Sequence, residues 1–350
     1  MFINNISYRE AIHKSMDSAL EDNEHVILIG QGVNDPTRIF GTTSNLLEKY
    51  GSKRLIDMPI CEEGMTGFAV GASLGGLYPI QTHIRMDFLL VAMNQLINTV
   101  SKYNYMYGGM FKVPMLIRAV VGRSWGQGPQ HSQSLQSVFS HFPGLQVIMP
   151  ATAGDIVNSY NHAIRNYEGP VLSIEHRLLY DYSFNSLSSP DPFSSYIIHE
   201  GEDITIVASS IMVEESLKAS EWVNKNKGIK VEIINILNVT NIDYECIFKS
   251  LKKTKRLIIA DTGWSPFGLG SEVISKVSQF FKHNLLSKPT SIGVKYSPCP
   301  TSHSLEDYFY PTMGTIVEAI YSQIYGHKNS LEIPSIEYCK KLSKKFKGPF

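Results

Sequence analysis

The sequence has no excess of charge of either sign. Its 350 residues include 32 lysines and arginines and 32 aspartates and glutamates, which gives a formal net charge of +0. A protein that binds a polyanion concentrates basic residues on its surface, because neutralising phosphates supplies most of the affinity. We therefore expect no nucleic-acid partner.

Paired cysteines and long apolar runs are also missing. The four cysteines (Cys61, Cys246, Cys299 and Cys339) are scattered and form no CxxC pair. This spacing favours reduced thiols over a disulfide framework or a zinc site. No stretch approaches the about 20 uninterrupted apolar residues of a membrane span, and residues 1–5 lack the basic start of a signal peptide. The sequence predicts a cytoplasmic protein that neither crosses a membrane nor binds a metal ion by itself.

Several catalytic motifs are absent as well. The sequence contains no GxxxxGK[ST] phosphate loop, no GxGxxG after its first predicted strand, no HExxH and no nucleophile elbow. Nucleotide-dependent kinases, metalloproteases, α/β-hydrolases and nicotinamide enzymes depend on these motifs. Those classes of enzyme therefore have no support.

What the sequence does contain is a regular alternation of short β-branched runs and longer segments of helical period. The first series predicts strands at 25–30, 55–60, 78–84, 115–122, 145–150 and 170–175, and helices at 63–75, 86–105 and 153–166. The strands are almost continuous in aliphatic residues, as in a parallel sheet that helices cover on both faces. We predict an α/β fold with a parallel sheet.

The alternation stops between 180 and 202, where Ser, Pro and Asp are frequent, and then resumes. The second series predicts strands at 204–209, 231–236, 256–261 and 290–295, with helices at 212–225, 244–253 and 269–281. Two domains also suit the length of the chain. We predict a first domain over 1–185, a linker over 186–202, a smaller α/β domain over 203–330 and a solvated, lysine-rich tail over 331–350.

The first candidate motif follows the second predicted strand. Glu62 and Glu63 stand where a helix begins, and glycines and alanines recur at 64, 67, 69, 71 and 72. Small residues at this spacing allow close packing, across a subunit interface or beneath a cofactor. Alternatively, the two carboxylates only complement the helix dipole. This segment alone leaves both interpretations open.

The second candidate motif is a glycine-rich loop over 122–134, at the carboxyl end of the fourth predicted strand. Open α/β sheets place their ligands at such ends. His131 lies among hydrogen-bonding neighbours, so it could act as an acid, a base or a substrate contact. Taken alone the loop is weak support, because glycine-rich loops and exposed histidines are common.

Five motifs in order carry a family resemblance. They are Pro59-Ile60-Cys61-Glu62-Glu63-Gly64, Tyr105-Met106-Tyr107-Gly108-Gly109, Gln130-His131-Ser132-Gln133, His141-Phe142-Pro143-Gly144-Leu145-Gln146-Val147 and Leu305-Glu306-Asp307. With them the chain resembles, from about residue 7 to 324, the β subunit of the thiamine-diphosphate-dependent decarboxylating component of 2-oxoacid dehydrogenases. That family belongs to the transketolase superfamily.

The resemblance implies a pyrimidine-binding domain followed by a transketolase C-terminal domain. It also implies an α2β2 assembly around a β–β homodimer core, with a lipoylated acyltransferase as a further candidate partner. In this family thiamine diphosphate lies between subunits, and the α subunit holds its diphosphate and Mg²⁺ on a Gly-Asp-Gly motif. This sequence contains no Gly-Asp-Gly, so we expect it to supply half of the site.

The resemblance also implies roles for individual residues. Glu62, not Glu63, falls on the family glutamate that activates the cofactor, and His131 falls on the histidine that faces the reacting carbon. Ile60, His83 and Met86 are expected at the cofactor, and Gln130 and Arg85, with His131, at the substrate.

The sequence departs from the family pattern at several positions. His83 replaces a phenylalanine that usually stacks on the pyrimidine, Asn94 replaces an aspartate, and Asp261-Thr262 stands where two titratable residues are usual.

We predict that the chain decarboxylates a 2-oxoacid and passes the acyl or aldehyde unit to an acceptor such as a lipoyl group. Two alternatives remain open. The first is a split transketolase-like enzyme with a sugar-like acceptor, which His83, Arg85 and Arg123 would suit. The second is a scaffold that keeps the fold without the chemistry.

Overall fold

A computed structural model of the chain describes residues 5–35, 37–123, 126–184, 191–282, 284–326 and 332–343. These residues form two compact units. The N-terminal unit consists mainly of Met1–Gly122 and Val138–Phe193, and the C-terminal unit consists of Arg123–Ser137 and Ser194–Lys345. The loop that carries His131 therefore packs with the C-terminal unit, although it follows a strand of the N-terminal one.

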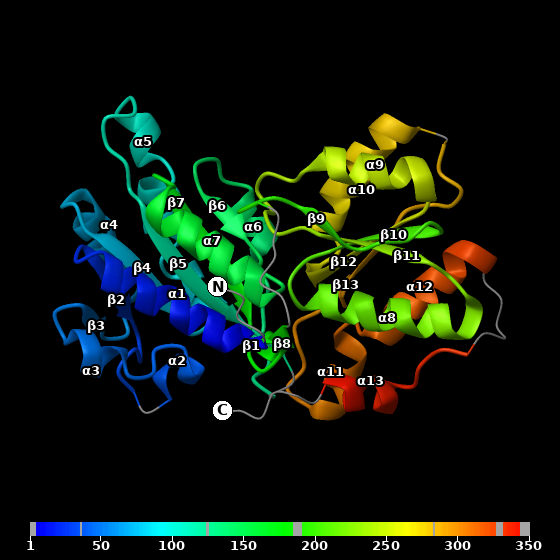
Figure 1. Ribbon diagram of the computed structural model, residues 1–350, viewed down its shortest axis with the longest axis horizontal. Helices are drawn as coiled ribbons and strands as arrows, with labels where there is room; N and C mark the ends of the chain where they lie inside the picture. Colours follow the sequence, from blue (N-terminus) through cyan, green and yellow to red (C-terminus); the bar gives the residue numbers. More distant parts are fainter. Residues whose placement is uncertain are drawn as a thin grey trace. The chain divides into compact units, whose positions relative to one another are not determined.

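The N-terminal unit contains a six-stranded parallel sheet in the order β3-β2-β4-β5-β7-β6 (Figure 1). Its strands are β2 (Val26–Gly30), β3 (Leu55–Asp57), β4 (Tyr78–His83), β5 (Met115–Val121), β6 (Gln146–Ile148) and β7 (Pro170–His176). A separate antiparallel pair joins β1 (Ile6–Ser7) to β8 (Ser183–Phe184). The parallel sheet expected from the aliphatic runs is confirmed.

Helices cover both faces of this sheet. The helices of the unit are α1 (Tyr8–Asp22), α2 (Arg38–Gly41), α3 (Leu46–Tyr50), α4 (Glu62–Leu74), η1 (Met86–Leu90), η2 (Gln95–Val100), α5 (Tyr103–Met106), α7 (Ala153–Arg165) and η3 (Arg177–Leu179). α6 (Gln136–Ser140) lies where the two units divide. Ser7 and Glu10 form a capping box that starts α1, and Thr152 and Asp155 form another that starts α7.

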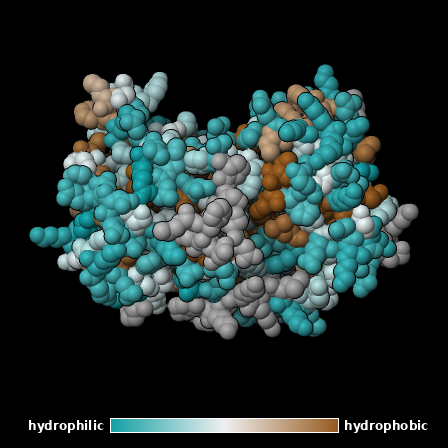
Figure 2. Space-filling view, in the orientation of Figure 1, coloured by the Kyte–Doolittle hydropathy of each residue, from teal (hydrophilic) through white to brown (hydrophobic). Residues whose placement is uncertain are grey.

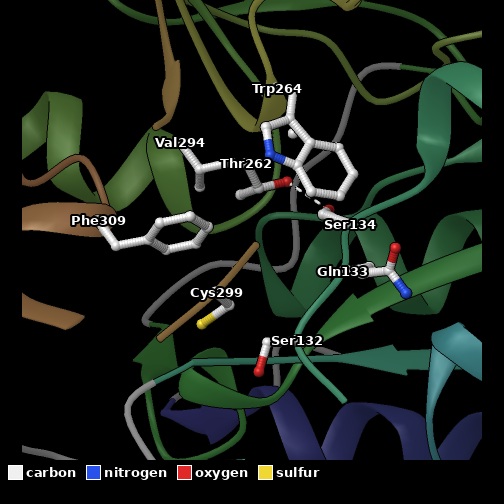
Figure 3. A pocket seen from close by; sticks show the side chains of 9 residues that line it. Ser132, Gln133, Ser134, Thr262, Trp264, Val294, Cys299 and Phe309 are labelled. Atoms are coloured by element: carbon white, nitrogen blue, oxygen red, sulfur yellow. Dashed lines mark hydrogen bonds between the residues drawn. The ribbon is translucent and has the colours of Figure 1, made fainter. Parts of the chain in front are cut away.

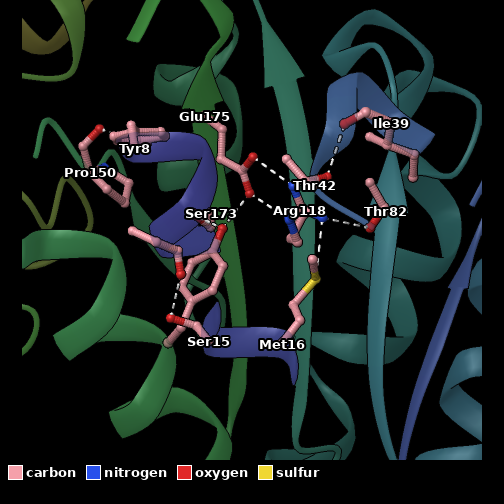
Figure 4. Close-up of polar contacts among 12 residues, drawn as sticks. Tyr8, Ser15, Met16, Ile39, Thr42, Thr82, Arg118, Pro150, Ser173 and Glu175 are labelled. Atoms are coloured by element: carbon pink, nitrogen blue, oxygen red, sulfur yellow. Dashed lines mark hydrogen bonds and ion pairs between the residues drawn. The ribbon is translucent and has the colours of Figure 1, made fainter. Parts of the chain in front are cut away.

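A buried ion pair lies in the middle of the parallel sheet. Arg118 on β5 donates to both oxygens of Glu175 on β7, at 2.6 and 2.9 Å, and neither side chain is exposed (Figure 4). Tyr180 donates to the same carboxylate at 2.6 Å, and Tyr160 donates to it as well. Burial lowers the pKa of Arg118, but the Glu175 charge, the hydrogen bonds to it and the neighbouring tyrosines together raise it by more, so the guanidinium stays protonated.

The C-terminal unit has a mixed five-stranded sheet in the order β13-β12-β10-β11-β9, in which only β9 is antiparallel to its neighbour among the strands described. The strands are β9 (Tyr196–His199), β10 (Ile204–Ala208), β11 (Val231–Asn235), β12 (Leu257–Trp264) and β13 (Thr290–Val294). The helices are α8 (Ile211–Lys227), α9 (Tyr244–Thr254), α10 (Leu269–Phe281), α11 (His303–Phe309), α12 (Met313–Tyr325) and α13 (Ile336–Ser343). Figure 1 shows α9 and α10 on one face of this sheet and α8 and α12 on the other. The expected α/β fold, with a parallel-sheet unit first and a smaller sheet second, is confirmed.

One local expectation was wrong, and two other segments contain elements that the sequence did not indicate. The segment 86–105 is not one helix: it forms the 3₁₀ helix η1, the π-helix η2 and the short α5. Asn, Thr, Val and Ser predominate between 94 and 101, and these residues lower helix propensity through side-chain competition and β-branching. The predicted linker contains β9, and the predicted tail contains α13. Residues 186–190, 331 and 344–350 of those stretches lie outside the described residues.

Candidate functional site

Glu62 is the first residue of α4, where the helix dipole favours a negative charge. Its side chain is largely buried, at 6 % exposure. No described residue donates a hydrogen bond to its carboxylate. Glu63 differs, because Asn94 Nδ2 donates to Glu63 Oε1 at 3.1 Å and the side chain is exposed. Of the two adjacent acids, only Glu62 is buried with no described donor at its carboxylate.

A chain of buried hydrogen bonds runs from the first turn of α4 to His83 at the end of β4. Thr66 Oγ1 donates to the Glu62 carbonyl at 2.8 Å, and Gln81 Nε2 donates to Thr66 Oγ1, also at 2.8 Å. Gln81 Nε2 also lies 2.8 Å from His83 Nε2. Because the amide nitrogen is the donor, His83 Nε2 accepts and the proton of the neutral ring lies on Nδ1.

His83 is 1 % exposed, and burial lowers its pKa to about 3. The ring is therefore neutral near pH 7, and no described residue hydrogen-bonds to its Nδ1. Met86 is fully buried too, whereas Ile60 is 86 % exposed. Of the three residues expected at the cofactor besides Glu62, only Ile60 presents surface in this unit. The cofactor contacts of His83 and Met86 remain predictions.

Arg85 is partly exposed and lies beside a second arginine that the sequence reasoning missed. The guanidinium of Arg85 lies 5.6 Å from the ring centre of Phe40, and that of Arg177 lies 4.4 Å from it. Burial and the positive charge of Arg85 lower the pKa of Arg177 to about 9. Arg177 directly follows β7, so its place after a predicted strand was the signal that could have revealed it.

Gln130 and His131 lie on the loop between β5 and α6, in the C-terminal unit; Gln130 is exposed and His131 half-buried. Arg123 Nη1 donates to the Pro311 carbonyl at 2.7 Å, and Gly126 N donates to Glu306 Oε1 at 3.2 Å. Gly128 has a φ of +68°, and a Cβ there would lie 2.6 Å from Thr301 Oγ1. The loop therefore needs glycine where it passes over Thr301.

A small pocket adjoins the His131 loop within the C-terminal unit (Figure 3). Its lining residues are Ser132, Gln133, Ser134, Thr262, Gly263, Trp264, Val294, Cys299 and Phe309. Ser134 Oγ and Thr262 Oγ1 lie 2.8 Å apart at its edge, and Cys299 Sγ lies 3.1 Å from the Tyr310 hydroxyl. The family motif pointed to the loop side of this pocket, but not to Cys299 or Phe309.

Two family descriptions match the chain in succession. "Transketolase, pyrimidine binding domain" matches residues 4–182, and "Transketolase, C-terminal domain" matches residues 195–316. The pyruvate dehydrogenase E1 component subunit β of Saccharomyces cerevisiae mitochondria is 35 % identical over 322 residues, covering 90 % of this chain and 88 % of that protein. The corresponding subunit of Rickettsia conorii is 34 % identical over 323 residues, covering 91 % and 98 %. The chain belongs to the pyruvate dehydrogenase E1 β-subunit family.

The family membership confirms the resemblance found in the sequence. At the level of the family it also confirms the expectation of a decarboxylating 2-oxoacid dehydrogenase component that depends on thiamine diphosphate. A solved structure, "Split gene transketolase, inactive beta4 tetramer", matches with a TM-score of 0.72 and 23 % identity, over 92 % of this chain and 99 % of that one. At this identity the likeness shows the transketolase fold alone.

The described residues contain neither a metal-ligand cluster nor a membrane-spanning helix. No three His, Cys, Asp or Glu side chains in the described ranges come together as metal ligands. Among the helices in the part of the chain that the structure describes, none combines the length and the apolar character that crossing a membrane requires.

Proposed function

We propose that the chain is the β subunit of an enzyme that decarboxylates a 2-oxoacid with thiamine diphosphate and passes the acyl or aldehyde unit to an acceptor such as a lipoyl group. The observation that carries the proposal is that the Glu62 carboxylate is largely buried and has no described hydrogen-bond donor. A largely buried carboxylate at the start of α4, with no described hydrogen-bond donor, is suited to bind a ring nitrogen. The Pro59–Gly64 motif of the sequence, which resembles the family's glutamate motif, supports this role for Glu62.

The residues of this chain fit one part of thiamine diphosphate and not the other. Glu62 offers a carboxyl group to the pyrimidine, but the sequence has no Gly-Asp-Gly motif to hold the diphosphate and Mg²⁺. An α subunit would supply that half of the site. Family members named E1 subunit β support this division, since their name implies a companion subunit.

When bound, the cofactor supplies an acidic carbon that adds to the 2-oxo group and accepts the electrons released with CO₂. Glu62 would hold a proton at the pyrimidine ring nitrogen and thereby make the exocyclic amino group basic. His131 would hydrogen-bond the 2-oxo oxygen of the substrate. Gln130, exposed beside it, would orient the substrate carboxylate.

We also propose a β–β homodimer. Phe68 on α4, Leu90 at the end of η1 and Val91 directly after it are exposed. Nothing lies within 4 Å of a Cβ placed at Gly71 on α4. A second group gathers at the tip formed by α5 and the residues after it (Figure 2), where Met106, Met110 and Phe111 are exposed. Contiguous apolar surface of this kind marks interaction sites.

The proposed location is the cytoplasm. All four cysteines, which the structure describes, are free thiols. Reduced thiols are typical of that compartment.

The transketolase-like alternative has one observation in its favour. The guanidinium groups of Arg85 and Arg177 lie 5.6 and 4.4 Å from the centre of the same phenylalanine ring. Two guanidinium groups suit a carboxylate or phosphate, such as the anionic end of a sugar-like acceptor. If this alternative holds, Arg177→Met should raise the KM for a phosphorylated aldehyde acceptor at least tenfold and leave the KM for a lipoyl acceptor unchanged.

The proposed function is tested by co-expressing the chain with its α partner and screening 2-oxoacids for decarboxylation that requires thiamine diphosphate. A lipoyl domain and a sugar aldehyde serve as competing acceptors. Decarboxylation followed by transfer to the lipoyl domain supports the proposal, and transfer to the aldehyde alone supports the alternative. Absence of decarboxylation with every 2-oxoacid, in a complex that assembles, contradicts the proposed function.

A further inference from the structure

Asp261 lies near the end of β12, and its side chain is 3 % exposed. Asp261 Oδ1 accepts hydrogen bonds from Gln136 Nε2 at 2.7 Å and from Thr262 N at 2.8 Å. Gln136 is the first residue of α6 and stands five residues after His131. A buried carboxylate of the C-terminal sheet therefore holds the end of the loop that carries His131.

The contact is part of a small hydrogen-bonded cluster. Ser134 Oγ donates to Gln136 Oε1 at 2.7 Å and lies 2.8 Å from Thr262 Oγ1 (Figure 3). With its oxygen accepting from Ser134, the Gln136 amide must direct its nitrogen at Asp261. The cluster thus fixes both the position and the orientation of the Gln136 side chain.

Gly263 makes room for this cluster. A Cβ at Gly263 would lie 2.8 Å from Gln136 Nε2 and 3.3 Å from the Ser134 carbonyl. A side chain at 263 would push Gln136 away from Asp261 without changing any charge.

Apart from burial, the groups that act most strongly on the Asp261 carboxyl are uncharged. They are the N–H groups of Thr262 and Gly263 on β12, the Gln136 amide at α6 and the N–H of Leu269 at the start of α10. Burial outweighs them and raises the pKa of Asp261 to about 6. Asp261 Oδ2 is buried without a hydrogen-bond partner among the described residues. Hydrogen bonds to an ionised acceptor are about twice as strong as neutral ones, so the charge of Asp261 strengthens its hold on Gln136.

We propose that Asp261 is a positioning residue that holds the His131 loop through Gln136, and that protonating Asp261 loosens the loop. The proposal rests on the proposed function insofar as His131 contacts the substrate. Asp261 itself touches neither substrate nor cofactor.

The first test is amide hydrogen exchange of the 126–136 segment in the full chain with its α partner, at pH 5 and pH 8 and corrected for intrinsic rates. In the wild type we expect exchange about tenfold faster at pH 5. In Asp261→Asn the pH response disappears, and in Gly263→Ala exchange is fast at both pH values. Asp243→Asn, which changes a cap of α9 outside the loop, serves as the control and should match the wild type.

The second test is the pH profile of kcat. A misplaced reacting group typically costs on the order of 100-fold in rate, so wild-type kcat should fall below pH 6 and Gln136→Leu should be slow at every pH. Gln136→Glu is decisive, because two carboxylates at hydrogen-bond distance repel each other until one of them is protonated, which raises the pKa of the pair. Its activity should rise as the pH falls through that raised pKa, opposite to the wild type.

The two tests separate this inference from the proposed function. If Asp261→Asn keeps the wild-type exchange at both pH values and Gln136→Glu keeps the wild-type profile, the inference is overturned, whatever the role of His131. If exchange responds as expected but His131→Ala has full activity, the loop is positioned by Asp261 and the proposed function of His131 is wrong.

Discussion

The buried pair of Arg118 and Glu175 predicts a large and specific loss of stability. Neither side chain is exposed, and the Glu175 carboxylate accepts from Arg118 and from the hydroxyls of Tyr160 and Tyr180. Glu175→Gln leaves a guanidinium charge in the sheet without its counter-charge. Breaking a buried pair in this way costs about 3–5 kcal/mol of the free energy of unfolding. Arg118→Met should cost a similar amount, because the carboxylate is then the unpaired charge.

The assay is urea denaturation of the full chain, followed by amide exchange in β5 and β7. These two strands carry Arg118 and Glu175, so the exchange reports unfolding of the unit that contains the pair. Glu202→Gln is the control, because the Glu202–Lys230 pair is exposed at 3.4 Å and should contribute less than about 1 kcal/mol. The double variant should cost less than the sum of the single ones. Single-variant losses below about 1 kcal/mol would refute the reasoning that the pair is fully desolvated.

Three further predictions concern pH, cofactor and assembly. The pKa of His83 is about 3 in the folded chain and near 6.5 in the unfolded chain. The unfolded chain therefore binds more protons between these pH values, and the free energy of unfolding falls as the pH drops through that window. His83→Phe should abolish this fall in urea titrations at pH 7 and 5, and a fall as large as in the wild type would contradict the prediction. The chain alone should show no tight Mg²⁺-dependent binding of thiamine diphosphate in calorimetry, and tight binding would disprove the half-site. Val91→Glu, at a position 55 % exposed, should convert a dimer to monomers in sedimentation at micromolar concentration, whereas Lys53→Glu should not.

The sequence predicted most of the strands because each is a short aliphatic run with a clear beginning and end. The sequence failed to predict elements whose residues show no clear strand or helix period. β9 is short, lies at the sheet edge next to a Ser- and Pro-rich stretch and pairs antiparallel with β11, so its four residues carry no distinctive period. The 86–105 segment has enough apolar residues to resemble a helix, but its Asn, Thr and Ser residues accommodate 3₁₀ and π turns.

The sequence indicated the candidate site residues that lie in motifs, but not the residues that surround them. Glu62 and His131 lie in short motifs that can be recognised from the order of their residues alone. The surroundings of these residues are set by tertiary contacts between distant segments, such as Gln136 with Asp261 or Arg85 with Phe40 and Arg177. No spacing in the sequence encodes those contacts, and the full burial of His83 depends on the packing of α4 against β4.

The most direct test of the central claim is hydrogen–deuterium exchange at the thiazolium carbon of the cofactor, in the complex with the α subunit and before any substrate is added. Glu62→Gln keeps the shape of the side chain but cannot hold a proton for the ring nitrogen, so exchange should slow by about 10²–10⁴-fold. Glu63→Gln, whose carboxylate bonds Asn94, should change the rate only a few-fold. Exchange at the wild-type rate in Glu62→Gln, in a complex that still assembles, would contradict the account.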